Sequence, residues 1–181
     1  KPIFFFFFKT HLSIFIIEMI KLIIFDMDGV LVDARDLHYH ALNRALSDVG
    51  DEYVISREEH LSTYDGLSTT KKLAKLTEDK NLPVDAHDKV WKLKQDHTHD
   101  IIANEFTWDE RIRGILRRLK SEGYIVSVAS NSIRPTVKMM LLRKGFLEYI
   151  DFYYSNQDVA KPKPATEIYL KCMIKAGIDP L

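Results

Sequence analysis

The apolar residues divide the chain into a first strand, a long helical stretch, and a segment in which helices and strands alternate. Leu22 to Phe25 is a short apolar run without polar alternation, which is typical of a parallel strand covered on both faces. From Trp108 onwards, helical spacing alternates with two further apolar runs, Tyr124 to Ala129 and Phe152 to Tyr154. This order predicts an α/β fold with a parallel sheet and right-handed crossovers.

The stretch between the first two strands is helical throughout and predicts an insertion. Its first helix carries apolar residues at i, i+3, i+4 and i+7, namely Leu42, Ala45, Leu46 and Val49. Ser56 and Glu59 match a capping box. Asp85 is placed to cap a long helix whose inner stripe includes Val90 and Ile101.

Two carboxylates follow the first strand, at the edge where open α/β sheets bind ligands. Asp26 and Asp28 are separated by one residue, and Gly29 permits a tight turn after them. Two carboxylates this close repel each other unless they share a cation. A hard divalent ion with oxygen ligands, such as Mg²⁺, is therefore expected at Asp26 and Asp28.

The string Asp26-Met27-Asp28-Gly29-Val30-Leu31-Val32-Asp33 resembles the first motif of the haloacid dehalogenase-like phosphohydrolases. The resemblance implies a Rossmann-like core in which Asp26 attacks phosphorus and Asp28 transfers protons. An acyl phosphate is readily cleaved by water, so a carboxylate nucleophile splits one difficult displacement into two easier ones.

Two later segments resemble the family's second and third motifs. Ser130 and Asn131 end the second predicted strand and would bind phosphoryl oxygens, although Ser-Asn-Ser taken alone is better explained as a plain turn and helix cap. Further on, Lys163 takes the position of the family's phosphate-binding lysine, with Lys161 as the alternative. Thr166 stands where the family usually has proline.

The helical insertion resembles the small α-helical cap of the subgroup that contains β-phosphoglucomutase and many small-metabolite phosphatases. His38 matches a histidine often found on the first cap helix, and a partly buried structural histidine is the alternative. The segment from Tyr64 through Gly66 to Ser68 and Thr69 resembles the cap's substrate-facing loop. Asp65 and Thr69 replace the basic residues that bind a second phosphate in the mutase, which disfavours a bisphosphate mutase.

The resemblance also indicates the domain boundaries. Residues 19–32 and 107–181 are expected to form the core, and residues 33–106 the cap. The family's fourth, acidic motif is absent, so we expect a C-terminally truncated fragment with weak activity or none. Residues 1–18 precede Met19, where we expect translation to start, and would be a non-native leader.

Composition excludes several other classes of partner. The formal net charge is zero, so nucleic acid and anionic membranes are not expected to bind. The basic residues between Arg111 and Lys120, including Arg113, are expected to form the solvated face of a helix. The single Cys172 fits a reducing, cytoplasmic compartment and a packed thiol. A monomer or weak dimer is expected.

The sequence therefore predicts a Mg²⁺-dependent phosphohydrolase that acts on a small phosphorylated metabolite through an aspartyl phosphate. Two alternatives remain open. One is a sugar-phosphate mutase of the β-phosphoglucomutase type, and the other is a non-catalytic protein that binds a phosphorylated ligand.

Overall fold

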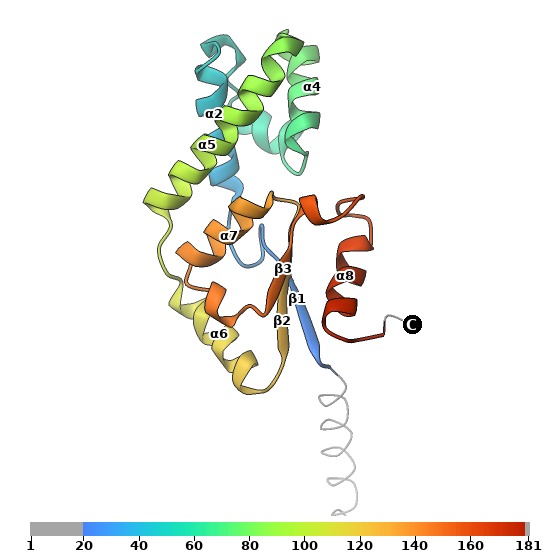
Figure 1. Cartoon of the computed structure of the whole chain (residues 1–181). Coiled ribbons are helices and arrows are strands. Elements are labelled where there is room, and N and C mark those ends of the chain that lie inside the picture. The colour runs from blue at the N-terminus through green and yellow to red at the C-terminus, as the bar shows by residue number, and fades with distance from the viewer. Residues whose placement is uncertain (1–19, 180–181) are drawn as a thin grey trace, which may run out of the picture. The chain divides into compact units, whose positions relative to one another are not determined.

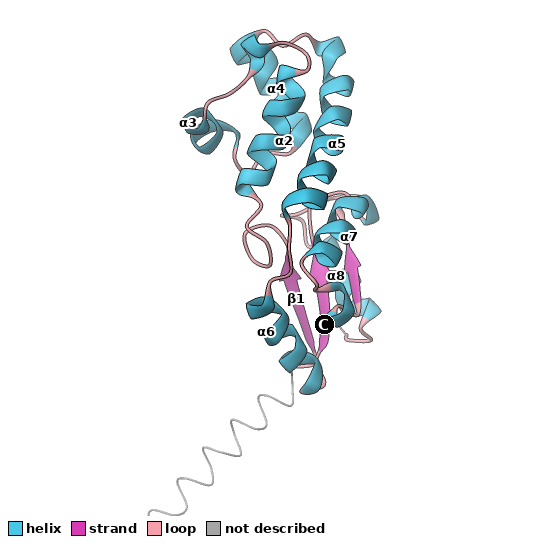
Figure 2. Ribbon diagram, turned by 90° about the vertical axis from the view of Figure 1, so that its left-hand side faces the viewer, coloured by secondary structure: helices cyan, strands magenta, loops and turns pink. Residues whose placement is uncertain are grey.

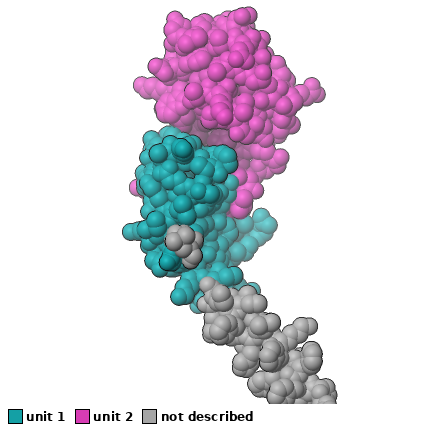
Figure 3. Space-filling view, turned by 90° about the vertical axis from the view of Figure 1, so that its right-hand side faces the viewer, with its two compact units in different colours: residues 1–27, 108–137, 145–181 teal, residues 28–107, 138–144 magenta. Residues whose placement is uncertain are grey.

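The computed structural model describes residues 20–179, so the predicted leader at 1–18 and start at Met19 lie outside the described residues. The described chain forms two compact units, coloured separately in Figure 3. The first contains residues 20–27, 108–137 and 145–179, and the second contains residues 28–107 and 138–144. The finer division into a core and a cap at residues 33 and 106 remains a prediction.

The first unit is built on a three-stranded parallel sheet. Its strands are β1 (Leu22–Asp26), β2 (Ile125–Ala129) and β3 (Phe152–Tyr154), in the order β1-β2-β3. The register places Asp26 beside Ala129. The predicted parallel α/β architecture is therefore confirmed.

Strand β1 is less buried than its apolar sequence suggested. All five of its residues are partly exposed, whereas β2 is buried from Val126 to Ala129. Among the described strands, β1 pairs only with β2 and forms an edge of the sheet. The partial exposure of β1 follows from this edge position, and its Leu22 and Ile24 still pack against the buried cluster of Ala129, Ile168 and Cys172.

Helices α6 (Glu110–Ser121) and α8 (Glu167–Lys175) lie on opposite sides of the sheet (Figure 1). Helix α8 contacts all three strands, and its Ile168 and Cys172 pack against Ala129. Between β2 and β3, helix α7 (Arg134–Arg143) contributes residues to both units. The predicted alternation of helix and strand is confirmed.

Arg113 is a buried anchor of α6 and not part of a solvated face, which corrects that prediction. Its Nε donates to the carbonyl of Gly145 at 3.1 Å, and its guanidinium pairs with Glu110 at 2.5 Å and Glu148 at 2.7 Å. The guanidinium also stacks 4.0 Å from the ring centre of Trp108. Gly145 has φ +71°, and a Cβ there would lie 2.9 Å from the Arg113 side chain, so this close contact requires glycine.

The second unit is helical apart from a single bridge between Asp28 and Val32, as far as residues 28–107 and 138–144 show (Figure 2). Its main helices are α2 (Arg35–Ser47), α4 (Thr69–Lys80) and α5 (His87–Glu105). The short α3 (Arg57–Glu59) continues into η2 (His60–Tyr64), which has π-helical hydrogen bonding. The prediction of an all-helical insertion is confirmed.

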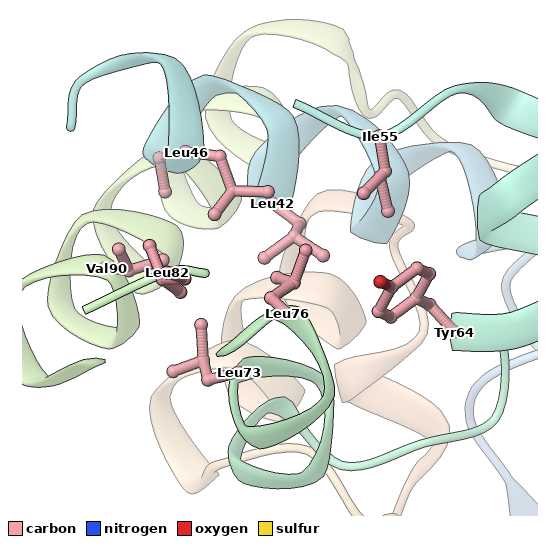
Figure 4. Packing of buried hydrophobic residues seen from close by; sticks show 9 residues of the cluster. Leu42, Leu46, Ile55, Tyr64, Leu73, Leu76, Leu82 and Val90 are labelled. Carbon is pink, nitrogen blue, oxygen red and sulfur yellow. The ribbon is translucent and has the colours of Figure 1, made fainter. Parts of the chain in front are cut away.

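These helices share one apolar core (Figure 4). It contains the buried residues Leu42, Ala45, Leu46, Ile55, Tyr64, Leu73, Leu76, Leu82 and Val90. The capping box at Ser56 is present, with both of its hydrogen bonds to Glu59. Asp85 does not cap α5, because it lies inside a 3₁₀ turn (Val84–Ala86), and Ala86 takes the N-cap position without a side-chain hydrogen bond.

Candidate active site

Asp26 ends β1 at the carboxyl edge of the sheet. Its side chain is 42% exposed, so the carboxylate is accessible to a ligand while the strand holds the backbone. Its Oδ1 accepts a hydrogen bond of 2.7 Å from the backbone N–H of Met27. Met27 itself is fully buried, which fixes the backbone immediately after the carboxylate.

Lys163 lies directly beside Asp26, although 137 residues separate the two in the sequence. Its Nζ is 2.6 Å from Oδ1 of Asp26 and donates a second bond of 3.0 Å to the carbonyl of Ala129. The Lys163 side chain is only 13% exposed. A charge-assisted hydrogen bond in such a setting is shorter and stronger than a neutral one.

Asn131 holds the backbone of Lys163 in place. Its Oδ1 accepts from the N–H of Lys163 at 2.9 Å, and its Nδ2 donates to the carbonyl of Lys163 at 3.0 Å. These two bonds let Asn131 position the backbone of Lys163, and its predicted contact with phosphate remains a prediction. No sequence signal connects residues 32 positions apart in this way.

Ser130 follows β2 and is completely buried. Its backbone N–H donates to the carbonyl of Tyr154 at 3.0 Å, and its Oγ accepts from the N–H of Ser132 at 3.0 Å. The hydroxyl thus closes the turn after the strand, as the alternative interpretation of Ser-Asn-Ser expected. Its proposed contact with phosphate remains a prediction.

The loop before α8 positions Lys163 and leaves Lys161 at the surface. Glu167 accepts from the backbone N–H groups of Ala160 at 3.0 Å and Lys161 at 2.9 Å. These two bonds lower the pKa of Glu167. Glu167 therefore fixes the loop that carries both lysines.

Asp28 belongs to the second unit, where it lies near His38 of α2. The distance from Nε2 of His38 to Oδ1 of Asp28 is 3.4 Å, and the two side chains are 24% and 30% exposed. Gly29 follows with φ +80°, a conformation that glycine adopts readily, and its N–H donates to the carbonyl of Val32 at 2.8 Å. This turn fixes the backbone next to Asp28.

The predicted substrate-facing loop divides into a core residue and surface residues. Tyr64 is 1% exposed and donates its hydroxyl to Asp79 at 3.0 Å, so its side chain serves the core and is not free to meet a substrate. Gly66 is exposed with φ +74°, and Ser68 caps α4 through a bond of 3.4 Å from the N–H of Lys71. Thr69 begins α4 and is half-buried.

Asp26 and Asp28 are the oxygen ligands that the sequence predicts for a hard cation. Across residues 20–179, no three His, Cys, Asp or Glu side chains converge as a metal site. Mg²⁺ usually takes one or two protein carboxylates, with waters and substrate phosphates completing its shell. Two carboxylates in a D-x-D pair therefore fit Mg²⁺ in ligand chemistry.

None of the helices within residues 20–179 is long and apolar enough to cross a membrane.

Comparison with known families gives one match that spans nearly all of the described chain. Residues 23–181 match the family model described as haloacid dehalogenase-like hydrolase. The match includes both sheet carboxylates and Lys163. It confirms the resemblance recognised in the sequence motifs.

Curated relatives are about one quarter identical to this chain over the aligned residues. Protein CbbY of Rhodobacter capsulatus is 24% identical over 167 residues, covering 89% of this chain and 74% of that protein. Pyrophosphatase PpaX of Bacillus velezensis is 25% identical over 174 residues, covering 90% of this chain and 72% of that protein.

Solved structures share the fold. CbbY from Rhodobacter sphaeroides, crystallised with xylulose-(1,5)bisphosphate, superposes with a TM-score of 0.75 at 22% identity, covering 90% of this chain and 75% of that one. β-Phosphoglucomutase from Clostridium difficile superposes with a TM-score of 0.68 at 23% identity, covering 90% and 73%. At this identity, the likeness concerns the arrangement of the elements.

Proposed function

Because the chain belongs to the haloacid dehalogenase-like hydrolase family, we propose that it hydrolyses a small phosphate ester through a phosphorylated Asp26. The observation that carries this proposal is the position of Lys163, whose Nζ lies 2.6 Å from the Asp26 carboxylate. A phosphoryl group that approaches an anionic nucleophile is repelled unless a cation offsets the charge. Lys163 is held where it can do so.

In the first step a carboxylate oxygen of Asp26 bonds to phosphorus while the bond from phosphorus to the leaving oxygen breaks. Asp28 donates a proton to that oxygen, which leaves as an alcohol. In the second step Asp28 accepts a proton from water, and the water oxygen attacks the phosphorus of the acyl phosphate. Inorganic phosphate leaves, and both carboxylates return to their starting states.

Within this scheme the remaining residues keep the reacting groups in position. Lys163 interacts with the phosphoryl oxygens and with Asp26, and Asn131 holds the Lys163 backbone through two hydrogen bonds. We propose that Ser130 contributes at the end of β2, where its hydroxyl borders the same turn. His38 is proposed to orient Asp28.

We also propose that Asp26 and Asp28 hold a Mg²⁺ ion. The ion would supply positive charge that stabilises the transferring phosphoryl group. The fit rests on the hard oxygen donors of both residues, since such ligands suit Mg²⁺ better than softer metals.

The relatives support hydrolysis more directly than isomerisation. PpaX is named a pyrophosphatase, and CbbY crystallises with a sugar bisphosphate, so small phosphorylated compounds are the proposed substrates.

We propose a cytoplasmic location and a monomer or weak dimer. The buried, unpaired thiol of Cys172 is in keeping with a reducing compartment.

Hydrolysis of p-nitrophenyl phosphate by the whole chain, with and without Mg²⁺, tests this function. We expect slow, Mg²⁺-dependent turnover that Asp26→Asn abolishes. The matched control is Asp33→Asn, because Asp33 is 74% exposed and lies on the same loop. Its rate should stay within about twofold of the parent rate. A folded parent chain that is silent across a panel of phosphate esters would favour the non-catalytic binder, and conversion of a hexose 1-phosphate to its 6-phosphate would favour the mutase.

A further inference from the structure

His60 is a buried histidine at the start of the π-helical segment η2. It is 2% exposed, and both of its ring nitrogens are buried without a hydrogen-bond partner among the described residues. The centre of its ring lies 5.3 Å from that of Tyr39 on α2. A buried polar group without a hydrogen bond costs free energy in the folded state, so this position weakens the helical unit.

The electrostatic surroundings of His60 favour the neutral form of its ring. Burial of the ring, and then the charge of Lys72 on α4, lower the pKa of His60. Lys72 is itself only 8% exposed. The other groups that act on the ring are Asp65 after η2, His38 on α2 and Arg57 on α3. Asp65 is exposed and acts in the opposite direction to the other two.

A second lysine extends the positive charge around Lys72. Lys94 on α5 is half-buried, and burial together with the charge of Lys72 lowers its pKa to about 8. Helices α4 and α5 contact each other within the second unit. Below pH 7 Lys94 is mostly protonated, so acid adds positive charge to His60 without removing it from Lys94.

His60 also fixes the backbone of the loop that follows η2. Its carbonyl accepts a hydrogen bond of 2.7 Å from the N–H of Asp65, five residues further on, which is the bond of a π-helical turn. Asp65 leads directly to Gly66 and Ser68 of the predicted substrate-facing loop. His60 and Tyr64 are the buried residues of η2, so their two side chains anchor the segment.

We propose that His60 makes η2 open locally in mild acid. A protonated ring has two N–H donors, and opening gives both of them water while it moves the new charge away from Lys72. When the His60 side chain leaves the core, the bond from Asp65 to its carbonyl breaks and the following loop is released. The opening does not depend on the function proposed above, whereas its consequence, slower turnover in acid, rests on that function.

Proton linkage fixes the sign and the size of the effect. A histidine in water has a pKa of about 6.5. The open form of η2 therefore binds more protons than the closed form as the pH falls below this value. The ratio of open to closed η2 rises accordingly, and for one proton its increase from pH 7 to pH 5.5 is at most about eightfold.

Amide hydrogen exchange of the whole chain at pH 7 and pH 5.5 tests the proposal. Protection factors are compared, because they remove the intrinsic effect of pH on the exchange rate. We expect the protection of residues 60–65 to fall by about two- to eightfold between the two pH values. The protection of α5 should change by less than about twofold, since the opening is confined to η2 and its loop.

The matched variants are His60→Gln and His40→Gln. His40 is exposed on α2, and its ring centre lies 5.1 Å from that of the same Tyr39. We expect His60→Gln to lose the pH dependence of protection in η2 and His40→Gln to keep it. If His60→Gln does not fold, the ring proton shifts of His60 in the parent provide a second measurement, and their titration midpoint should lie below 6.5.

Equal protection of η2 at both pH values in the parent, the same loss in His60→Gln, or the same loss throughout α5 would overturn the proposal. A titration midpoint of His60 at or above 6.5 would also overturn it. Acid-dependent opening in a chain that hydrolyses no phosphate ester would refute the proposed function and leave the role of His60 standing.

Discussion

Replacing Lys163 by methionine should remove most of the catalytic activity and leave the fold intact. At the observed 2.6 Å, two unit charges attract by about 6 kcal/mol at an effective dielectric constant of 20. Because Asp26 is 42% exposed, solvent screens part of this energy. A preorganised group of this kind is typically worth about 100- to 1000-fold in rate, so we expect kcat/KM for p-nitrophenyl phosphate to fall by that factor.

The matched control is Lys161→Met. Lys161 is exposed, and only its backbone N–H is fixed, by Glu167. Its kcat/KM should change by less than about threefold. Lys163→Met should still unfold in a single cooperative transition, since Asn131 holds the backbone of residue 163 and not its ammonium group. Our reasoning is refuted if Lys161→Met loses as much activity as Lys163→Met.

Three further substitutions test other parts of the structure. Asn131→Ala should lower kcat about tenfold with a smaller change in KM, because Lys163 then loses its backbone clamp; a change confined to KM would instead favour a direct phosphate contact. Tyr64→Phe should lower the free energy of unfolding by about 1 kcal/mol in urea titration, through loss of the hydrogen bond to Asp79, without altering KM. If the stability of Tyr64→Phe is unchanged and its KM rises, the Tyr64 hydroxyl contacts the substrate instead. Lys94 has a pKa of about 8 in the folded chain, below the usual 10.5. Between pH 8 and pH 10.5 the unfolded chain therefore binds more protons than the folded chain, so the free energy of unfolding of the parent rises with pH over this range. Lys94→Met should therefore be more stable than the parent by about 1–3 kcal/mol at pH 7, and by much less at pH 10.5. If urea titrations give the same stability difference at both pH values, Lys94 is not buried as described.

Much of the first unit follows from short-range features of the sequence. The three apolar runs became β1, β2 and β3, and the motif alignment placed Lys163, ahead of Lys161, at the sheet edge that carries Asp26. Such runs are informative because a buried parallel strand must be apolar along its whole length. The capping box at Ser56 was recognisable for a similar reason, since both of its hydrogen bonds are local.

Features that depend on distant partners could not be predicted. The contacts of Asn131 with Lys163 and of Arg113 with Gly145 each join residues 32 positions apart, and polar side chains in isolation suggest solvent exposure. Asp85 was misplaced because a 3₁₀ turn and an α-helix start have similar compositions.

The central claim is that Asp26 becomes phosphorylated during turnover. Acid quenching in the steady state, followed by borohydride reduction of acyl phosphates and peptide mass spectrometry, locates the adduct directly. The account predicts a reduced residue at position 26 and none in the Asp26→Asn chain. An adduct at Asp28 or elsewhere, or measurable turnover with no adduct at any aspartate, would contradict it.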